Sequence, residues 1–163
     1  MDTITQDWIK IRQHVNKSFR QNLHVAIASV GEDNLPTVTP IGTLFLNRDH
    51  TTGFYFEKYP SRLPKHAEVN PNICVLAVNT SKWFWIKALF RNRFKQYPAI
   101  KLYGKLGERR NASSSELNRL NRRMKRTRKT KGHQYLWGDM KTIREVNFTK
   151  AEVIKLGKMT HKL

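Results

Sequence analysis

The sequence of 163 residues has a single cysteine, Cys74, and six scattered histidines. One cysteine cannot form a disulfide within the chain, and no pair of Cys or His residues has the short spacing of a structural zinc site. Cys74 lies in an apolar segment, so we interpret it as a small core residue rather than a reactive thiol. The composition therefore predicts neither a metal site nor a disulfide framework.

Several functional signatures are also missing. The chain has no Gly-rich phosphate loop of nucleotide hydrolases and no nucleophile elbow, so no residue can be nominated as catalytic. The N-terminus lacks the basic-then-apolar pattern of a secretory signal, which predicts a cytoplasmic protein. Residues 83–90, which are apolar apart from Lys87, are far fewer than the roughly 20 residues of a membrane span. Length predicts one domain over residues 1–163.

Acidic residues are scarce: 12 Asp and Glu stand against 31 Lys and Arg, a formal charge of +19. The imbalance is local. Residues 1–81 hold 8 basic and 7 acidic side chains, residues 82–131 hold 17 and 2, and residues 132–163 hold 6 and 3. A basic middle section in an otherwise nearly balanced chain indicates a surface for an anionic partner rather than a property of the whole fold.

A candidate phosphate-binding corner follows the apolar segment 54–58. A turn at Tyr59-Pro60-Ser61 leads into a predicted helix over 62–69, and a helix start presents unpaired N–H groups to anions. Ser61 adds a hydroxyl donor, Arg62 can form two parallel hydrogen bonds with phosphate oxygens, and Lys65 lies one turn later. The alternative is that Ser61 is an ordinary N-cap beside two solvated cations.

The order of predicted elements around this corner is informative. Strands are expected at 23–30, 35–46, 54–58 and 73–79, with turns at 31–34 and 47–53 and the helix 62–69 ended by Asn70-Pro71. With the segments "LPTVTPIG", "FYFEKYPSR" and "NPNICVLAVN" in this order, residues 23–80 resemble the flavin-binding split-barrel family that includes pyridoxamine 5'-phosphate oxidase.

This resemblance implies an α+β fold, an antiparallel split β-barrel with flanking helices, and a homodimer that binds flavin mononucleotide (FMN) between its subunits. It implies an oxidoreductase acting on a small-molecule redox substrate or a nicotinamide donor. The residues that match the cofactor-binding positions are Thr39, Pro40, Ile41, Phe56, Glu57, Ser61 and Arg62, with Lys65 as an addition.

The chain also departs from the oxidases of that family. It has Leu44 where they carry a basic residue, and its C-terminal segment lacks their Arg-aliphatic-His element, so their pyridoxal substrate is not expected. Because the family also includes haem and deazaflavin binders, these cofactors are alternatives to FMN. A further alternative is a non-enzymatic protein that binds nucleic acid or an anionic membrane surface on a split-barrel scaffold.

Residues 81–98 form a basic, aromatic-rich insert. Trp83, Trp85, Leu89 and Phe90 alternate with cations, and three interpretations stay open. The apolar side chains could pack on the barrel or a dimer partner, lie along an anionic membrane surface, or cover the ring of the cofactor.

A basic helix is predicted over about 114–128. The capping box Ser113-x-x-Glu116 marks its start, and Leu117, Leu120 and Met124 follow at helical spacing. Its other face and the residues just after it carry eight cations, which could bind a nucleic-acid backbone or stay solvated: Arg119, Arg122, Arg123, Lys125, Arg126, Arg128, Lys129 and Lys131. Residues 131–139 are interpreted as a packed loop or as a segment that approaches the flavin from the partner subunit.

Three further segments complete the prediction. Trp8, Ile11 and Val15 indicate an amphipathic helix over about 5–17 that packs across the barrel. Residues 100–110 are expected to be a strand with a bulge or bend at Gly104, and 143–148 and 152–156 are expected to be extended.

Overall fold

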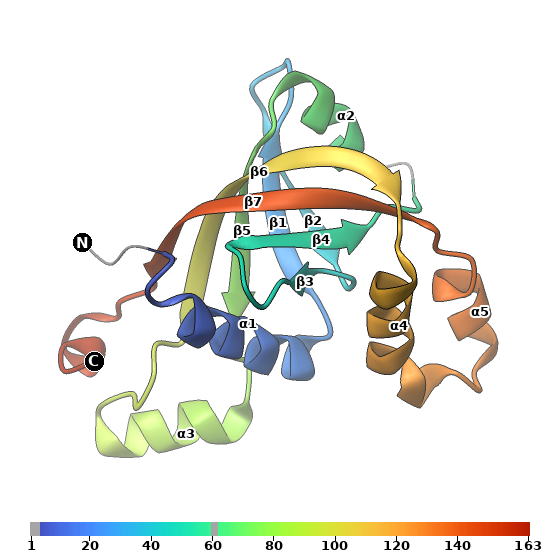
Figure 1. Ribbon diagram of the computed structural model, residues 1–163. Coiled ribbons are helices and arrows are strands. Elements are labelled where there is room, and N and C mark those ends of the chain that lie inside the picture. Colours follow the sequence, from blue (N-terminus) through green and yellow to red (C-terminus); the bar gives the residue numbers. More distant parts are fainter. Residues whose placement is uncertain (1–3, 60–61) are drawn as a thin grey trace.

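The computed structural model describes residues 4–59 and 62–163. In these residues the chain forms one antiparallel sheet with helices around it (Figure 1). The elements in chain order are α1 (Trp8–Asn22), β1 (Val25–Val30), β2 (Pro36–Ile41), β3 (Phe45–Leu46), β4 (Thr52–Phe56), α2 (Arg62–Val69), β5 (Asn72–Val78), α3 (Lys82–Arg91), β6 (Ala99–Asn111), α4 (Ser114–Arg123), the 3-10 turn η1 (Lys125–Thr127), α5 (Lys131–Trp137), β7 (Thr142–Val153) and the 3-10 turn η2 (Gly157–Thr160). The predicted α+β class is confirmed.

The sheet is a partly closed barrel. Its strand order is β2-β1-β5-β6-β7-β4-β3, so the long strands β6 and β7 join the steep β2-β1-β5 half to the β4-β3 half (Figure 1). The run predicted as one strand over 35–46 is therefore two strands on opposite edges, separated by residues 42–44. In that link the Thr43 hydroxyl accepts from the Phe56 N–H at 3.1 Å and approaches the Phe56 carbonyl at 3.3 Å. This connection draws the two edges toward each other without closing the sheet.

The bend expected at Gly104 is confirmed. The register of β6 against β7 shifts between Tyr103 and Gly104 and again between Leu106 and Arg109. A Cβ atom at position 104 would lie 2.5 Å from the Asn147 carbonyl oxygen, so only glycine allows this close approach of the two strands. Residues 143–156, expected as two extended pieces, belong mostly to the single strand β7, which accommodates the bulge.

Helix α1 fills the open side of the barrel. Trp8, Ile11 and Val15 are buried, as their spacing predicts, and the helix continues to Asn22 so that Phe19 joins the same core cluster. The Trp8 indole N–H donates to the Asn47 carbonyl at 2.9 Å. Leu23, with a φ of 61°, ends the helix in the left-handed conformation of a C-cap.

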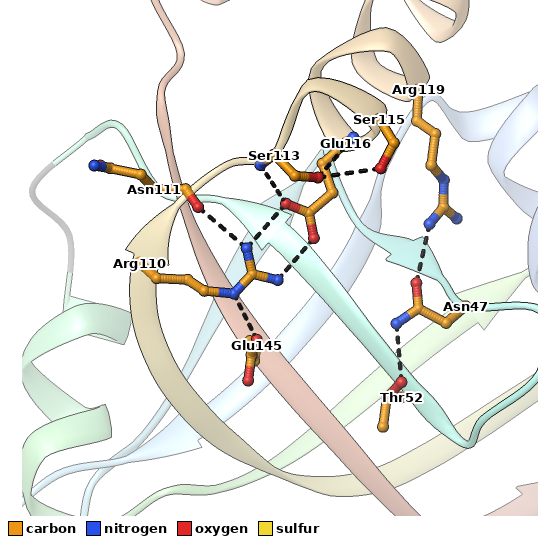
Figure 2. A network of polar contacts seen from close by, with 9 residues as sticks. All are labelled: Asn47, Thr52, Arg110, Asn111, Ser113, Ser115, Glu116, Arg119 and Glu145. Carbon is orange, nitrogen blue, oxygen red and sulfur yellow. Dashed lines mark hydrogen bonds and ion pairs between the residues drawn. The ribbon is translucent and has the colours of Figure 1, made fainter.

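Helix α4 docks on the β3 edge through polar side chains (Figure 2). The capping box is confirmed, because Ser113 Oγ accepts from the Glu116 N–H and Glu116 accepts from the Ser113 N–H at 2.8 Å. Arg110 on β6 bridges Glu116 and Glu145 at 2.8 and 2.6 Å. Arg119 donates to the Leu46 carbonyl at 2.8 Å and to Asn47, which satisfies the free edge of β3.

Three predictions for this region are corrected. Helix α4 ends at Arg123 and a 3-10 turn replaces its last predicted turn, where the Thr127 hydroxyl donates to the Met124 carbonyl. Two of the eight cations, Arg119 and Arg123, also face the protein and stack on Phe45, so the solvated basic face is smaller than expected. Residues 131–137, expected as a loop, form α5.

Candidate cofactor-binding site

Helix α2 is held tightly against β1. Leu63 belongs to the main core cluster, and His66 Nδ1 lies 3.0 Å from Ser29 Oγ on β1. Gly31 permits this packing, because a Cβ atom there would lie 2.7 Å from the His66 ring. With these two side chains buried, the opposite face of α2 points to solvent.

The solvent face of α2 carries the predicted phosphate ligands. Arg62 and Lys65 are both exposed, three residues apart, in a first turn that contains no acidic residue. Within residues 4–59 and 62–163, neither makes a hydrogen bond or an ion pair. Ser61, the third predicted ligand, lies outside the described residues. Two cations on the first turn of a helix form an arrangement that suits a phosphate group.

The predicted ring-binding residues lie on the edge strand β2. Thr39, Pro40 and Ile41 pair with Ile27, Ala26 and Val25 of β1, and the other side of β2 has no partner strand in the described sheet. Pro40 is exposed, whereas Thr39 and Ile41 are half-buried. A proline on this strand is compatible with an edge position, because its missing N–H breaks no ladder.

Strand β2 and helix α2 are linked through β1. Ser29 Oγ lies 3.3 Å from Thr37 Oγ1 on β2 and 3.0 Å from the His66 ring on α2. The edge strand and the helix that carries Arg62 are therefore positioned by one shared side chain. The tertiary structure brings these two parts of the predicted site into one neighbourhood.

Phe56 is placed differently from the other predicted residues. Its ring is 3% exposed and packs edge-on against Phe45 and Phe54, with ring centroids 6.4 and 6.0 Å apart. Its backbone N–H and carbonyl are both bonded to Thr43. Phe56 thus shapes the end of β4 from inside the core and offers no free polar group of its own.

Glu57 is at the centre of a buried ion-pair network. Its carboxylate accepts from Arg144 Nε at 2.7 Å and Nη2 at 3.1 Å, from the Tyr55 hydroxyl at 2.9 Å, and pairs with Arg109 Nε at 3.0 Å. The side chains of Glu57 and Arg144 are each 6% exposed. Burial, and then the charge of Glu57, raise the pKa of Tyr55, while hydrogen bonding to Glu57 raises the pKa of Arg144.

This network joins three strands and α2. Glu57 follows β4, Arg109 is on β6, and Arg144 on β7 also lies 3.6 Å from Glu68 of α2. Neither arginine is predicted from the sequence, since they lie 52 and 87 residues after Glu57 in a chain rich in arginine. Only the register of β4, β6 and β7 brings them to this carboxylate. Glu57 therefore positions the site without presenting a free carboxylate to it.

One outer face of the β2-β1-β5 half is apolar and uncovered. Ala28 lies between Val38 and Cys74, and the next row across the sheet is Pro40, Ala26 and Leu76. Val38 is 66% exposed and Leu76 is 37% exposed. Cys74 is half-buried, and this burial raises the pKa of its thiol. We call these six residues the sheet patch. It includes Val38 and Pro40 of the edge strand β2, which alternate with Thr39 and Ile41 along that strand.

Two cavities lie elsewhere, beside α3 and the C-terminal segment, and neither includes Arg62 or Lys65. Among the described residues, no group of three His, Cys, Asp or Glu side chains is arranged to hold a metal ion. The candidate site is thus an open surface beside α2 and β2 with cationic and apolar parts.

No protein-family model and no curated protein matches the sequence. Solved structures do match. HupZ of Group A Streptococcus is 14% identical, with a TM-score of 0.58 over 90% of this chain and 92% of its own. An FMN-binding protein from Syntrophomonas wolfei is 14% identical, with a TM-score of 0.57 over 94% of this chain and 95% of its own.

A pyridoxamine 5'-phosphate oxidase-like protein from Lactobacillus delbrueckii is 15% identical, with a TM-score of 0.52 over 86% of this chain and 90% of its own. The matches also include the haem storage protein HutZ of Vibrio cholerae and an F420 reductase. At such low identity the comparisons establish the fold and not the ligand. The chain therefore has the split-barrel fold shared by FMN-binding, pyridoxamine 5'-phosphate oxidase-like, HupZ and HutZ proteins.

Proposed function

We propose that this chain is an FMN-binding flavoprotein with a redox function. The observation that carries the proposal is the pair Arg62 and Lys65, exposed on the first turn of α2 beside the edge strand β2 of a split barrel. A phosphomonoester bound there would meet two cations and the positive end of a helix. No acidic residue in that first turn opposes an anion.

Each part of the site has a proposed task. Arg62 and Lys65, together with Ser61, would hold the phosphate of FMN, and the backbone of Thr39, Pro40 and Ile41 would support its ring. Phe56 and Glu57 would fix the wall behind the cofactor, because their own contacts tie the end of β4 to the core. When bound, FMN supplies hydride or electron transfer, and a small-molecule redox substrate or nicotinamide donor would provide the other half of the reaction.

The proposal includes a homodimer. The sheet patch is apolar, next to β2 and uncovered in the described chain, so a second copy placed on it would bury Val38 and Leu76 and close the open side of the site. Large contiguous apolar patches on a protein surface commonly mark interaction sites. A monomer at micromolar concentration in light scattering, with and without FMN, would contradict this part.

The decisive experiment is a titration with FMN followed by quenching of flavin fluorescence. Because a charge-assisted hydrogen bond contributes about 1.5 to 3 kcal/mol, Arg62→Ala should raise the Kd for FMN by roughly 10- to 150-fold. Arg48→Ala is the matched control, since Arg48 is also exposed but lies in the turn before β4, at the opposite end of that strand from Phe56. An unchanged affinity in Arg62→Ala would remove Arg62 from the site.

Haem and a deazaflavin are the second candidates, because the proteins that share this fold include a haem storage protein and an F420 reductase. The three ligands have different absorption spectra. Purified protein loaded with each in turn would show a flavin band, a Soret band or the deazaflavin band. Absence of flavin binding together with tight binding of haem or F420 would replace FMN in the proposal.

A further inference from the structure

Helix α3 is firmly anchored by one of its faces. Ser81 caps its first turn by accepting from the Phe84 N–H, and Ala88 is buried. The Trp85 indole N–H donates to the Asn79 carbonyl at 2.7 Å, and its ring packs 5.2 Å from that of Phe94. These contacts fix the rotation of the helix. Trp85 therefore packs on the protein, as one interpretation of the insert expected.

The opposite face of α3 is apolar and exposed. Trp83 is 71% exposed, Leu89 67% and Phe90 88%, and Ile86 completes the row. We call these four residues the α3 apolar face. Trp83, Ile86 and Phe90 follow each other at i, i+3 and i+7, which places them on one side of the helix, with Leu89 beside them. The expectation that Trp83, Leu89 and Phe90 pack on the barrel is not met within this chain.

Cations border this face and acids are absent from it. Between Glu68 and Glu108 the sequence has no Asp or Glu. Five Lys and Arg residues lie in α3 and the segment that follows it: Lys82, Lys87, Arg91, Arg93 and Lys95. A short helix with an apolar face and a cationic border is the pattern of segments that lie in the interface of an anionic membrane.

A basic cavity adjoins the end of α3. It has a volume of about 760 Å³, within the usual range of ligand pockets. Its lining includes Arg93, Lys95, Lys158 and Lys162. A second, smaller cavity lies between α3 and the same segment, lined by Phe84, Lys87, Ala88, Arg91, Arg93 and Lys95. Both present cationic groups beside the α3 apolar face, where lipid headgroups would lie.

We propose that the α3 apolar face docks this protein onto the surface of an anionic phospholipid bilayer. Trp83, Ile86, Leu89 and Phe90 would enter the headgroup region, and the bordering lysines and arginines would contact lipid phosphates. The ten-residue helix lies in the membrane plane. Across residues 4–59 and 62–163, every helix is too short or too polar to span the hydrocarbon core.

Charge and chemistry favour this occupant. If a second copy of the chain docked on the same face, the five cations of one copy would lie opposite the five cations of the other. Like-charge repulsion opposes this arrangement. A polynucleotide offers bases to aromatic rings but nothing apolar to the aliphatic Ile86 and Leu89. A bilayer satisfies both groups, because indoles favour the interface and cations favour anionic headgroups.

The surface is separate from the candidate cofactor site. Figure 1 shows α3 at one end of the molecule beside α1 and the C-terminal turn, with α2 at the other end. Docking through α3 would leave α2, which carries Arg62, at the end of the molecule away from the lipid. The inference therefore goes beyond the proposed function and does not depend on it.

The test is flotation of the full chain with vesicles of phosphatidylcholine alone or with about 30 mol% phosphatidylserine, an anionic lipid of cytoplasmic leaflets. Wild-type protein should float with the anionic vesicles and far less with the neutral ones. The double variant Trp83→Ser/Phe90→Ser should bind at least about tenfold more weakly, because both rings bury their area only in the bilayer. Brominated lipid should quench the exposed Trp83.

Matched variants separate this surface from general charge attraction. Lys87→Glu/Arg91→Glu should lose binding, whereas Arg122→Glu/Arg126→Glu, the same charge change on exposed residues of α4 and η1, should retain it. Arg62→Ala should float like the wild type. Circular dichroism and urea unfolding test whether each variant is folded. We expect all of them to fold, because the substituted side chains are exposed.

Three results would overturn the inference. The first is equal binding of Trp83→Ser/Phe90→Ser and the wild type. The second is an equal loss in the two charge-reversal variants. The third is an absence of vesicle binding while single-stranded polynucleotide or polyglutamate binds through α3, which would assign this face to a nucleic acid or an acidic protein.

Discussion

Replacing Glu57 with glutamine tests whether this residue supports the site from inside the protein. Glu57→Gln keeps the size of the side chain and removes its charge. Arg144, only 6% exposed, would then keep the carboxylate of Glu68, which is 75% exposed and 3.6 Å away, and the Gly107 carbonyl at 3.4 Å. The variant therefore leaves a buried guanidinium without its principal partner.

The magnitude follows from the contacts. Removing one member of a buried ion pair typically costs about 3 to 5 kcal/mol, because the remaining charge stays desolvated. Two features place the cost of Glu57→Gln near the lower end of this range. Arg109 is 58% exposed and can be rehydrated, and the amide can still accept from the Tyr55 hydroxyl. We expect a loss of about 3 kcal/mol in the free energy of unfolding, or roughly 6 to 12 °C in Tm for a domain of this size.

Urea unfolding followed by circular dichroism measures this loss. Glu68→Gln is the matched control, since it removes the exposed partner of the same Arg144 and should change the free energy of unfolding by less than about 0.5 kcal/mol. Combining Glu57→Gln with Arg144→Met should recover part of the stability, because the double variant buries no unpaired charge. The charge of Glu57 should not affect FMN affinity directly. At temperatures where Glu57→Gln is folded, this variant should therefore bind FMN nearly as well as the wild type.

Two results would refute this reasoning. One refuting result is that Glu57→Gln and Glu68→Gln have the same free energy of unfolding within about 0.5 kcal/mol. The buried Glu57–Arg144 pair would then stabilise the protein no more than the exposed Glu68–Arg144 pair does. If Glu57→Gln keeps its stability but loses FMN, Glu57 is a cofactor ligand, as the family resemblance implied.

Two other predictions concern α4. Arg123 stacks 3.6 Å from the Phe45 ring centroid and donates to the Leu44 carbonyl, and burial lowers its pKa to about 9, so it is charged at neutral pH. Arg123→Ala should lower the free energy of unfolding by about 2 kcal/mol in urea, and an equal effect of the exposed Arg122→Ala would contradict this. Hydrogen bonding to Arg110 lowers the pKa of Glu116 below 4.5, so its stabilisation is complete above pH 4.5 and is lost as pH falls through the folded value. Glu116→Gln should therefore flatten the acid limb of stability against pH, and an unchanged limb would exclude this pair.

Local patterns predicted most elements of the fold. The capping box at Ser113 and the apolar spacing of Trp8, Ile11 and Val15 each depend on a few neighbouring residues. These patterns can be recognised in the sequence alone, because the interacting residues lie within a few helical turns of each other. The same holds for the position of Arg62 and Lys65 on one exposed face of a short helix.

Long-range contacts were beyond these patterns. Nothing local distinguishes Arg144 and Arg109 from the 12 other arginines and the 17 lysines, and only the pairing of β4, β6 and β7 brings them to Glu57. The split of residues 35–46 between two sheet edges likewise depends on barrel curvature, since both halves read as extended chain.

The sequence by itself determined the strand and helix order, the charge imbalance and the two cations at the start of α2. The tertiary structure decided which side chains face solvent. It turned Arg119 and Arg123 inward, buried Glu57 and left Trp83 and Phe90 exposed. The physical reason is that periodicity identifies two faces of an element, whereas packing against residues far along the chain selects the face that is buried.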